Sequence, residues 1–560
     1  MAMYYYASKL NEASCSGCNI KVPPAPTEPA PVPPPPIEHA PLPPDSALLH
    51  GTGLSYYDND DYYSMVRGNK FMSETTCKHI VMNGGINFVD TQKVEAPQIS
   101  AVLAPGVKAL TTLPYMSCPL EKPEVEYKDG QIVSATLDAL VDMLRPGASK
   151  NFTFTFLLCS RLFVKPHELL SKLCKRYFKT YDKIGKAEIN DLKQKELADM
   201  VAFVRVLKQW TSMFPYDFRD DRVMALVRSI TQRCVAEHMG SVRAEVSTML
   251  EKLLDKLTAL EQYEATLVEI PQVTSVDQLP QGDILTLGLT PAELANQLTL
   301  VELHKLSFVG PEEFVQTFAP AQASAPTSSC GKPAINLHHI DTKCTRNLEA
   351  YADWFNRLSY LVATDILKCT KSKYRARVIE QWVMTARECF NLGNFNSLMA
   401  IISALNMSPI SRLKKTWSRT SAVCGQQLRQ LELCIEPSGN HARYRAALAA
   451  APTETAVPLL SVTCRDLHFA NQGSPSKLPG NYVNFEKCSL LARYVSMQLA
   501  ARRLTDEDSV PVSAPQTPAR RLFADRPTLS ENVLELISFE REPPVDHSEK
   551  ERLKRLRGGT

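Results

Sequence analysis

The sequence predicts an all-α protein in which two helical domains follow a disordered, proline-rich N-terminal region. Apolar residues recur at helical spacing through most of the chain after residue 130, whereas the strict alternation typical of strands is scarce. Proline is concentrated near the N-terminus, where 12 of the 39 prolines lie between Pro23 and Pro44. These observations indicate a folded helical body behind a tail that contributes no core.

Length, charge and cysteine content restrict the class of protein. The chain has 560 residues, a length that favours about three or four domains. Its 63 Lys and Arg residues nearly balance 60 Asp and Glu residues, and a net charge of +3 argues against nucleic acid as a partner. Fifteen cysteines are too few for a disulfide scaffold in a chain this long, which favours reduced thiols. We find no signal peptide and no apolar run of roughly 18 residues, so we expect a cytoplasmic protein with peripheral membrane contact at most.

The first region, residues 1–124, carries few signals of order. Besides the proline tract it contains a Tyr/Asp cluster at residues 56–63 and a stretch rich in Thr, Pro and Gly. The PxxP spacing at Pro33 to Pro36 and Pro41 to Pro44 favours polyproline II, which an SH3-type protein binds. A solvated spacer is the alternative interpretation of the same tract.

The first helical domain is predicted at residues 125–270. Helical texture begins near Gly130, and an apolar stripe that starts at Thr136 stops at Pro146-Gly147. A further helical segment, in which Pro166 restarts a helix, is followed by three more helical patterns. These segments are 156–177, 193–213, 221–238 and 241–269.

The second helical domain is predicted at residues 283–545. Thr290-Pro291-Ala292-Glu293 combines an N-cap, a proline at the first helical position and a capping-box glutamate. Gly310-Pro311 repeats this logic, and residues 319–343 are typical of a linker. Two further helices, separated at Gly393-Asn394, follow the apolar positions Ile379, Trp382, Val383, Ala386, Cys389 and Phe390, then Phe395, Leu398, Met399, Ile402 and Leu405.

Motifs for covalent chemistry are missing from the sequence. It contains no GxxxxGK[ST] loop and no GxSxG elbow, and Ser171 stands where an HExxH motif beginning at His167 needs its second histidine. Cys15 and Cys18 form a lone CxxC pair, and His338-His339 has no evident partner. We therefore expect no metal and no cofactor. The protein is predicted to act by binding, which includes lowering a partner's affinity for its own ligand.

Several segments resemble, in the same order, the Ras guanine-nucleotide exchange factor family. In the second block they are LGLTPAELANQLTLVELHKLSFVGPEEFVQTF, NFNSLMAIISALNMSPISRLKKTW and VPLLSVTCRDLHFANQGSPSKLPGNYVNF, the last continued by Glu486-Lys487. In the first block, residues 130–177 with Trp210 and Pro215-Tyr216-Asp217-Phe218 are similar to the family's N-terminal motif (REM) domain. The resemblance implies a REM domain at 125–270, a catalytic domain with a protruding helical hairpin at 283–545, and a basic tail at 546–560.

The resemblance also implies a partner. SFVGPEEFVQTF, NRLSYLVATDIL and the ending SEKERLKRLR most resemble the small Ras-GEF domain-containing family 1, whose members are associated with Rap-type GTPases. The implied function is promotion of GDP release from a small GTPase of the Rap/Ras group. Such a protein would be a conformational catalyst without covalent chemistry, recruited to membranes that carry the GTPase.

In that family a helical hairpin enters the GTPase between its switch regions and disrupts the magnesium and phosphate site. Here the hairpin would begin near Leu459 and Leu460, and its first helix would end at Gly473 in the manner of a C-cap glycine. Its side chains aimed at the phosphate site would be His468 and Gln472. The family often has a bulky apolar or aromatic residue at the first position and a glutamate at the second. Gln472 is neutral and supplies no negative charge for electrostatic expulsion of the phosphate, whereas a steric wedge stays open.

The resemblance places further residues at the GTPase, each with an alternative role. Asn406 would face the GTPase, but it could equally stop a helix. Leu459 and Leu460 would touch the partner or anchor the hairpin, whereas Asn394 and Asn396 are favoured as helix caps. The complete set of predicted GTPase-binding residues is Asn406, Asn440, His441, Tyr444, Leu459 and Leu460.

A second function from another class stays open. A non-catalytic scaffold would keep the fold, bind a GTPase, and use the proline tract to dock SH3-type proteins. His468 and Gln472 are the departures that support this alternative. The basic tail, Lys550, Arg552, Lys554, Arg555 and Arg557, is compatible with contact to anionic lipid or with a solvated helix end.

Overall fold

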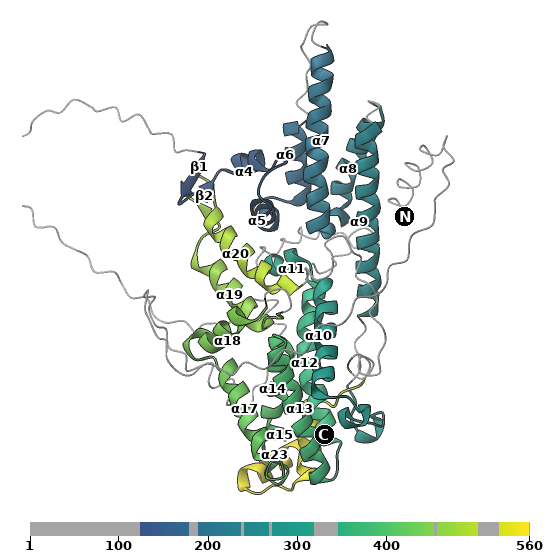
Figure 1. Cartoon of the computed structure of the whole chain (residues 1–560), viewed down its shortest axis with the longest axis vertical. Coiled ribbons are helices and arrows are strands. Elements are labelled where there is room, and N and C mark those ends of the chain that lie inside the picture. Colours follow the sequence, from purple (N-terminus) through teal and green to yellow (C-terminus); the bar gives the residue numbers. More distant parts are fainter. Residues whose placement is uncertain are drawn as a thin grey trace, which may run out of the picture. The chain divides into compact units, whose positions relative to one another are not determined.

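The structure is a computed structural model, and every residue that it describes lies in one compact unit, Phe71–Thr560. The described residues are 124–177, 189–236, 240–267, 272–317, 345–452, 456–501, 523 and 526–558. The proline tract, the Tyr/Asp cluster and the predicted linker 319–343 lie outside them. Helices dominate the described chain, which confirms the all-α prediction (Figure 1).

A β-hairpin opens the described chain, where the sequence analysis predicted no strand. β1 (Val125–Lys128) pairs with β2 (Gln131–Ala135) in antiparallel fashion. Asp129 and Gly130 connect them with φ values of 52° and 74°, the left-handed conformation that an Asp-Gly turn between two strands favours. The prediction of helical texture from Gly130 onward was wrong at this point, because strands of four and five residues are too short for periodicity to separate from noise.

The first helical block follows this β-hairpin. α4 begins after Thr136, whose hydroxyl accepts a hydrogen bond from the backbone N–H of Ala139, so the predicted apolar stripe is confirmed as a capped helix. The patterns at 193–213, 221–238 and 241–269 are confirmed as helices with slightly different ends. The elements are α4 (Leu137–Met143), α5 (Lys150–Ser160), α6 (Pro166–Tyr177), α7 (Ile189–Met213), the 3-10 helix η2 (Pro215–Arg219), α8 (Asp221–Ala236) and α9 (Gly240–Thr266).

The second block begins with the two proline-started helices that the sequence predicts. The Thr290 hydroxyl accepts from the Glu293 backbone N–H, and the Glu293 carboxylate accepts from the Thr290 N–H, so the capping box is confirmed. The elements are η3 (Val276–Gln278), η4 (Ile284–Leu287), α10 (Pro291–Ser307), α11 (Pro311–Gln316), α12 (Arg346–Leu367), α13 (Ser372–Asn391), α14 (Phe395–Asn406), α15 (Ser408–Ser411), α16 (Lys414–Trp417), α17 (Ala422–Ile435) and α18 (Ser438–Ala450).

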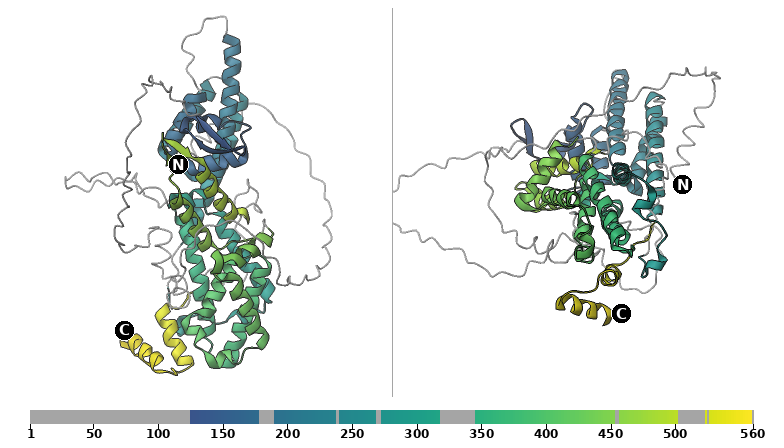
Figure 2. Two further views of the ribbon diagram at one scale, coloured as in Figure 1. Left: turned by 90° about the vertical axis from the view of Figure 1, so that its left-hand side faces the viewer. Right: turned by 60° about the horizontal axis from the view of Figure 1, so that its bottom comes forward.

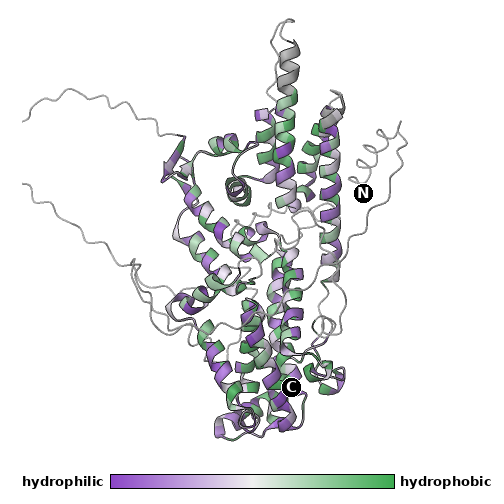
Figure 3. Cartoon of the chain, viewed as in Figure 1, coloured by the Kyte–Doolittle hydropathy of each residue, from purple (hydrophilic) through white to green (hydrophobic). Residues whose placement is uncertain are grey.

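The core of this block lies among α10, α12, α13 and α14. Trp354, Trp382, Phe395 and Leu398 are each at most 2% exposed. Hydrophobic and hydrophilic residues alternate along most helices in Figure 3. α14 is the exception, because most of its residues are buried against α10, α12 and α13. α14 is therefore a fixed platform for the elements packed against it.

Two antiparallel helices and a short β-connection form the segment that the sequence predicts as a helical hairpin. α19 (Leu460–Gly473) leads through β3 (Lys477–Leu478) and β4 (Tyr482–Asn484) into α20 (Phe485–Gln498). The first helix ends at Gly473 as predicted, but Gly473 is not among the described glycines with positive φ, so the expected C-cap glycine geometry is wrong.

The hairpin is joined to the first helical block through this β-connection. β2 pairs with β4 through Ser134↔Asn484 and Ala135↔Val483, which gives the four-stranded sheet β1-β2-β4-β3. α5 packs against α20, where the rings of Phe152 and Phe485 stack with centroids 5.5 Å apart (Figure 1). The N-terminal helices therefore support one side of the hairpin.

The last two helices pack against the second block. α22 (Glu531–Arg541) contacts α12 and α15, and α23 (His547–Gly558) contacts α22; Figure 2 shows both in yellow. Buried Arg375 of α13 donates to the Glu542 carboxylate at 3.2 Å, and Thr416 donates to the same carboxylate. α16 and the end of α22 are thereby held together.

Candidate functional site

The candidate site consists of the hairpin α19–α20 and the parts of α14 and α18 beside it. We define the base of the hairpin by Asn396, Tyr444, Leu459 and Leu460. We define its tip by His468, Phe469, Gln472 and the side chain beneath them, Lys487.

The base is buried and joined by specific contacts. Leu459 and Tyr444 are 1% and 2% exposed, and the Leu459 backbone N–H donates to the Tyr444 hydroxyl oxygen at 2.9 Å. The Tyr444 ring also meets Phe395 edge to face, with centroids 5.3 Å apart. Because burial raises the pKa of Tyr444, its hydroxyl stays protonated at neutral pH. Leu459, Leu460 and Tyr444 thus hold the start of α19 against α14.

A buried carboxylate fixes the part of α14 that faces the base. Glu302 of α10 is fully buried, and it accepts from Ser397 Oγ at 2.7 Å and from Asn396 Nδ2 at 3.2 Å. Burial raises the pKa of Glu302, while these donors act in the opposite direction. Asn394 caps α14 by accepting from the Ser397 N–H, which confirms its predicted role. Asn396 is buried, and its Oδ1 lies 3.5 Å from the Leu460 N–H that donates to it.

A left-handed turn precedes the regular part of α18. Gly439, Asn440 and His441 have φ values of 58°, 56° and 58°. The turn leaves Asn440 exposed and places His441 in the interior, where it is 2% exposed. Burial, assisted by the nearby charge of Arg465, lowers the pKa of His441 to about 4, so the imidazole is neutral at pH 7.

Charged side chains tie this turn to the hairpin. Arg465 of α19 donates to Asn440 Oδ1 at 2.6 Å, and Arg445 of α18 donates to both carboxylate oxygens of Asp466 at 2.7 and 2.9 Å. Arg445 also donates to the Asn440 carbonyl oxygen at 2.9 Å. These bonds set the position of α19 relative to α18, and they bring Asn440 beside the hairpin.

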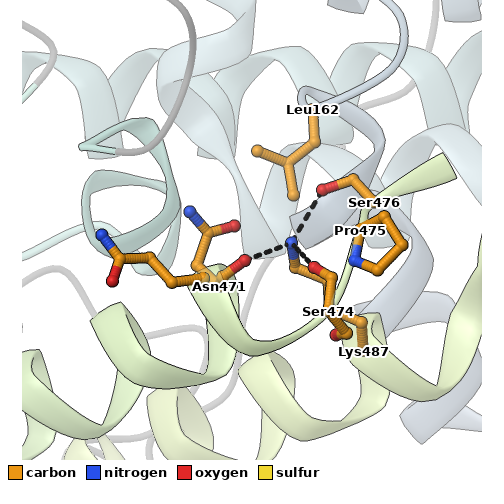
Figure 4. A pocket seen from close by; sticks show the side chains of 7 residues that line it. Leu162, Asn471, Ser474, Pro475, Ser476 and Lys487 are labelled. Carbon is orange, nitrogen blue, oxygen red and sulfur yellow. Dashed lines mark hydrogen bonds between the residues drawn. The ribbon is translucent and has the colours of Figure 1, made fainter. Parts of the chain in front are cut away.

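Lys487 closes the tip from below. Its ammonium group donates to the carbonyl oxygens of Asn471 and Ser474 and to Ser476 Oγ at 2.7, 2.8 and 2.9 Å (Figure 4). Only 5% of Lys487 is exposed. Nearby, Asn484 caps α20 by accepting from the Lys487 N–H and donates to the Pro475 carbonyl oxygen at 3.0 Å. The residues after α19 are therefore pinned to the first turn of α20.

A cavity of about 480 Å³ lies next to this clamp. Leu162, from the connection between α5 and α6, contributes to its wall together with Gln472 and Lys487 (Figure 4). All three ammonium hydrogens of Lys487 already have acceptors in the chain, which leaves the cation no donor for an added ligand. The cavity is thus part of the support of the tip.

The outer face of the tip combines polar and apolar side chains. His468 is half-buried, Gln472 is exposed one turn further along α19, and Phe469 is 62% exposed. His468 and Gln472 therefore share a helix face, as their spacing requires. Phe469 was not predicted as a site residue, because the sequence does not show whether other helices cover its ring.

The structure divides the predicted GTPase-binding residues into two classes. Asn406, the last residue of α14, and Asn440 are exposed. His441, Tyr444, Leu459 and Leu460 are buried, and their side chains pack inside the chain. Asn406 lies ten residues along α14 from Asn396, about 15 Å at the rise of an α-helix, so it belongs to a surface separate from the base.

The described residues contain neither a cluster of metal ligands nor a membrane span. Within them, no three His, Cys, Asp or Glu side chains gather in a way that could hold a metal ion. None of the described helices is both long and apolar enough to cross a bilayer.

Comparison with known proteins assigns both helical blocks. The RasGEF domain family matches residues 293–489, and the RasGEF N-terminal motif family matches residues 131–232. The human (Homo sapiens) Ras-GEF domain-containing family member 1B is 39% identical over 457 residues, which cover 77% of this chain and 92% of that protein. The mouse (Mus musculus) protein of the same name is 38% identical over 454 residues, with the same coverage of both chains. Human Ras-GEF domain-containing family member 1C is 37% identical over 447 residues, 77% of this chain and 91% of that protein.

Proposed function

The chain belongs to the Ras guanine-nucleotide exchange factor family, and from this premise we propose that it promotes GDP release from a Rap-type GTPase by inserting the hairpin α19–α20 at the switch regions. Membership of this family implies that the partner is a small GTPase of the Ras group. The Rap preference rests on the likeness to the Ras-GEF domain-containing family 1.

One observation carries the proposed mechanism. The hairpin has a buried base and a clamped end, whereas its tip presents Phe469 and Gln472 to solvent. A wedge needs this combination, because a tip that gave way on contact would not transmit force to the partner's switch regions. Binding energy at the tip is then available to stabilise the nucleotide-free form of the GTPase.

The chemistry of the tip favours steric action. Gln472 carries no charge, and His468 is flanked by Phe469, with ring centroids 6.2 Å apart. Neither side chain repels a phosphate through a fixed negative charge. We attribute nucleotide release to the bulk of His468 and Phe469 at the magnesium and phosphate site, with Gln472 as a hydrogen-bonding group.

The test measures release of a fluorescent GDP analogue from a panel of Rap and Ras proteins in the presence of the full-length chain. We expect faster release from at least one Rap protein than from the Ras proteins. Absence of acceleration across the whole panel would contradict the exchange function. The variant Gln472→Glu separates the two mechanisms: a steric wedge predicts little change in the rate, whereas electrostatic expulsion predicts a faster release than wild type.

The neutral Gln472 also supports the alternative of a non-catalytic GTPase-binding scaffold. A scaffold would bind nucleotide-free and GDP-bound GTPase with similar affinity, because binding that does not discriminate between the two forms cannot shift the equilibrium. Affinity measurements with the same GTPase panel, with and without GDP, distinguish the two functions. The SH3-docking role of the proline tract is tested by deletion of residues 23–44, which should abolish capture of SH3 domains and leave GDP release unchanged.

A further inference from the structure

The C-terminal helix α23 is docked on the second block through one side only. Glu549, Arg552, Leu553 and Leu556 are its half-buried residues, and they recur with the i, i+3, i+4, i+7 spacing of a single helix face. Lys550, Lys554 and Arg555 are exposed and lie outside that face. The sequence alone identifies the tail only as a basic segment. The structure shows which side of α23 faces solvent.

Two ion-pair contacts hold this orientation. Arg412 donates to both carboxylate oxygens of Glu549 at 3.0 Å. Arg552 donates to the Glu535 carboxylate of α22, and its NH1 group donates to Ser408 Oγ at 2.8 Å. The acidic partners in these contacts lie on the inner side, so they do not cancel the charge of Lys550 and Lys554.

The helix α16 adds cations next to α23. Lys414 and Lys415 are exposed. α16 begins at Lys414, two residues after Arg412, and the hydrogen bonds from Arg412 to Glu549 therefore bring the start of α16 near the start of α23. The Lys415 backbone N–H donates to Glu542, the residue after α22, at 2.9 Å. Exposed carboxylates nearby are Glu540, Asp546 and Glu551.

An apolar residue projects from the loop between α22 and α23. Val545 is 77% exposed, the largest fraction among the large hydrophobic side chains of the described chain. Its backbone N–H donates to Glu549 Oε2 at 2.9 Å, which holds the loop in place while the side chain faces solvent. Pro543, two residues earlier, is exposed as well.

We propose that exposed Val545 and four exposed lysines on the adjacent helices, Lys414 and Lys415 of α16 and Lys550 and Lys554 of α23, form a docking surface for an anionic lipid bilayer. Clustered lysines are attracted to the negative surface potential of such a membrane, and an exposed apolar tip enters the headgroup region. A single-stranded nucleic acid fits less well, because stacking on unpaired bases needs exposed aromatic rings. Trp417, the aromatic residue of α16, is half-buried and donates through Nε1 to the Ile410 carbonyl oxygen.

Sedimentation of the full-length chain with vesicles tests this proposal. We expect binding to vesicles of phosphatidylcholine with phosphatidylserine, none to phosphatidylcholine alone, and loss of binding as salt is raised. Lys550→Glu/Lys554→Glu should weaken binding by about tenfold or more, and Val545→Ser should weaken it without changing the salt dependence. The matched control Arg205→Glu/Lys208→Glu reverses two exposed cations at helical spacing on α7 and should bind like wild type.

Two further measurements keep the test decisive. Thermal unfolding and GDP release in solution should be unchanged in Lys550→Glu/Lys554→Glu, which shows that the variant folds. Equal sedimentation with both vesicle types, or equal loss in the α7 control, would overturn the proposal. Retention of an unstructured RNA that is lost in Lys550→Glu/Lys554→Glu, without vesicle binding, would assign the surface to nucleic acid instead.

Discussion

At the base of the hairpin α19–α20 the side chains are buried, and their polar groups form hydrogen bonds within the chain. At the tip, by contrast, large side chains face solvent above the buried Lys487. Tyr444 and Leu459 are at most 2% exposed, while Phe469 is 62% exposed. The two ends lie on one helix, α19, only about three turns apart. The difference therefore comes from what packs against each end.

The contrast separates positioning from contact. Packing against α14 and α18 fixes the position of the hairpin. The buried residues of the base make no contact with a partner, because a partner cannot reach them. The tip leaves apolar surface exposed, which costs free energy in the isolated chain and is recovered only when a partner covers it. Substitutions at the base should therefore change stability first, and substitutions of the solvent-facing side chains at the tip should change exchange alone.

Tyr444→Ala should have the largest effect on stability. It removes a buried aromatic ring and leaves the Leu459 N–H without its acceptor, so we expect a loss of about 3–5 kcal/mol in the free energy of unfolding. GDP release should fall with it, because the start of α19 loses its support. Chemical denaturation followed by helical signal measures the first effect, and the fluorescent GDP assay measures the second.

The conservative variant sharpens this result. Tyr444→Phe keeps the ring against Phe395 and removes only the hydroxyl acceptor, at a cost of about 1–3 kcal/mol. If Tyr444→Ala instead unfolds like wild type and loses exchange alone, Tyr444 contacts the GTPase directly, and the distinction between base and tip does not hold.

The helices were predictable because their start signals are local. The start of α10 is predictable from the segment Thr290-Pro291-Ala292-Glu293 alone. In the structure α10 begins at Pro291, and both hydrogen bonds of the capping box are present. β1 and β2 were missed although Asp129-Gly130 is a strong turn signal, because strands of four and five residues are too short to show a clear period. The pairing of β2 with β4 joins residues about 350 positions apart, and no local pattern encodes that contact.

The sequence located the segments that carry the candidate site residues, but it did not show which of these residues are buried. The resemblance located Asn440, His441 and Tyr444 on one segment, but the left-handed turn at residues 439–441 decides which of them faces solvent. Three consecutive left-handed residues, two of them not glycine, are set by the contacts of Asn440 with Arg445 and Arg465. From the sequence alone Lys487 would be expected on the surface, since its three hydrogen-bond acceptors are evident only in the structure.

Lys487→Met should have an intermediate effect, because Lys487 belongs to the tip but is buried. The substitution keeps much of the buried stem and removes the ammonium group that satisfies two carbonyl oxygens and a hydroxyl, so we expect a loss of about 1–3 kcal/mol. A loosened tip should also slow GDP release at saturating GTPase. The readouts are denaturation and the dependence of the release rate on GTPase concentration.

A nearby lysine provides the control for this prediction. Lys477 of β3 is exposed, so Lys477→Met removes an equal charge and should leave both readouts unchanged. A Lys487→Met protein with reduced stability and a wild-type maximal release rate would show that the clamp supports the fold without positioning the tip.

Phe469→Ala should have the smallest effect on stability and still reduce exchange. Its ring is largely in water in the isolated chain, so we expect a change of less than about 0.5 kcal/mol in the free energy of unfolding. Because the ring is the largest apolar group at the tip, GDP release should slow by about tenfold, the cost of roughly one lost buried contact with the partner. Val423→Ala on α17 is the matched control, since Val423 is also 62% exposed but lies outside the hairpin. Equal release rates in Phe469→Ala and Val423→Ala would place the GTPase contact elsewhere on α19, and the polar residues His468 and Gln472 would then have to carry the wedge by themselves.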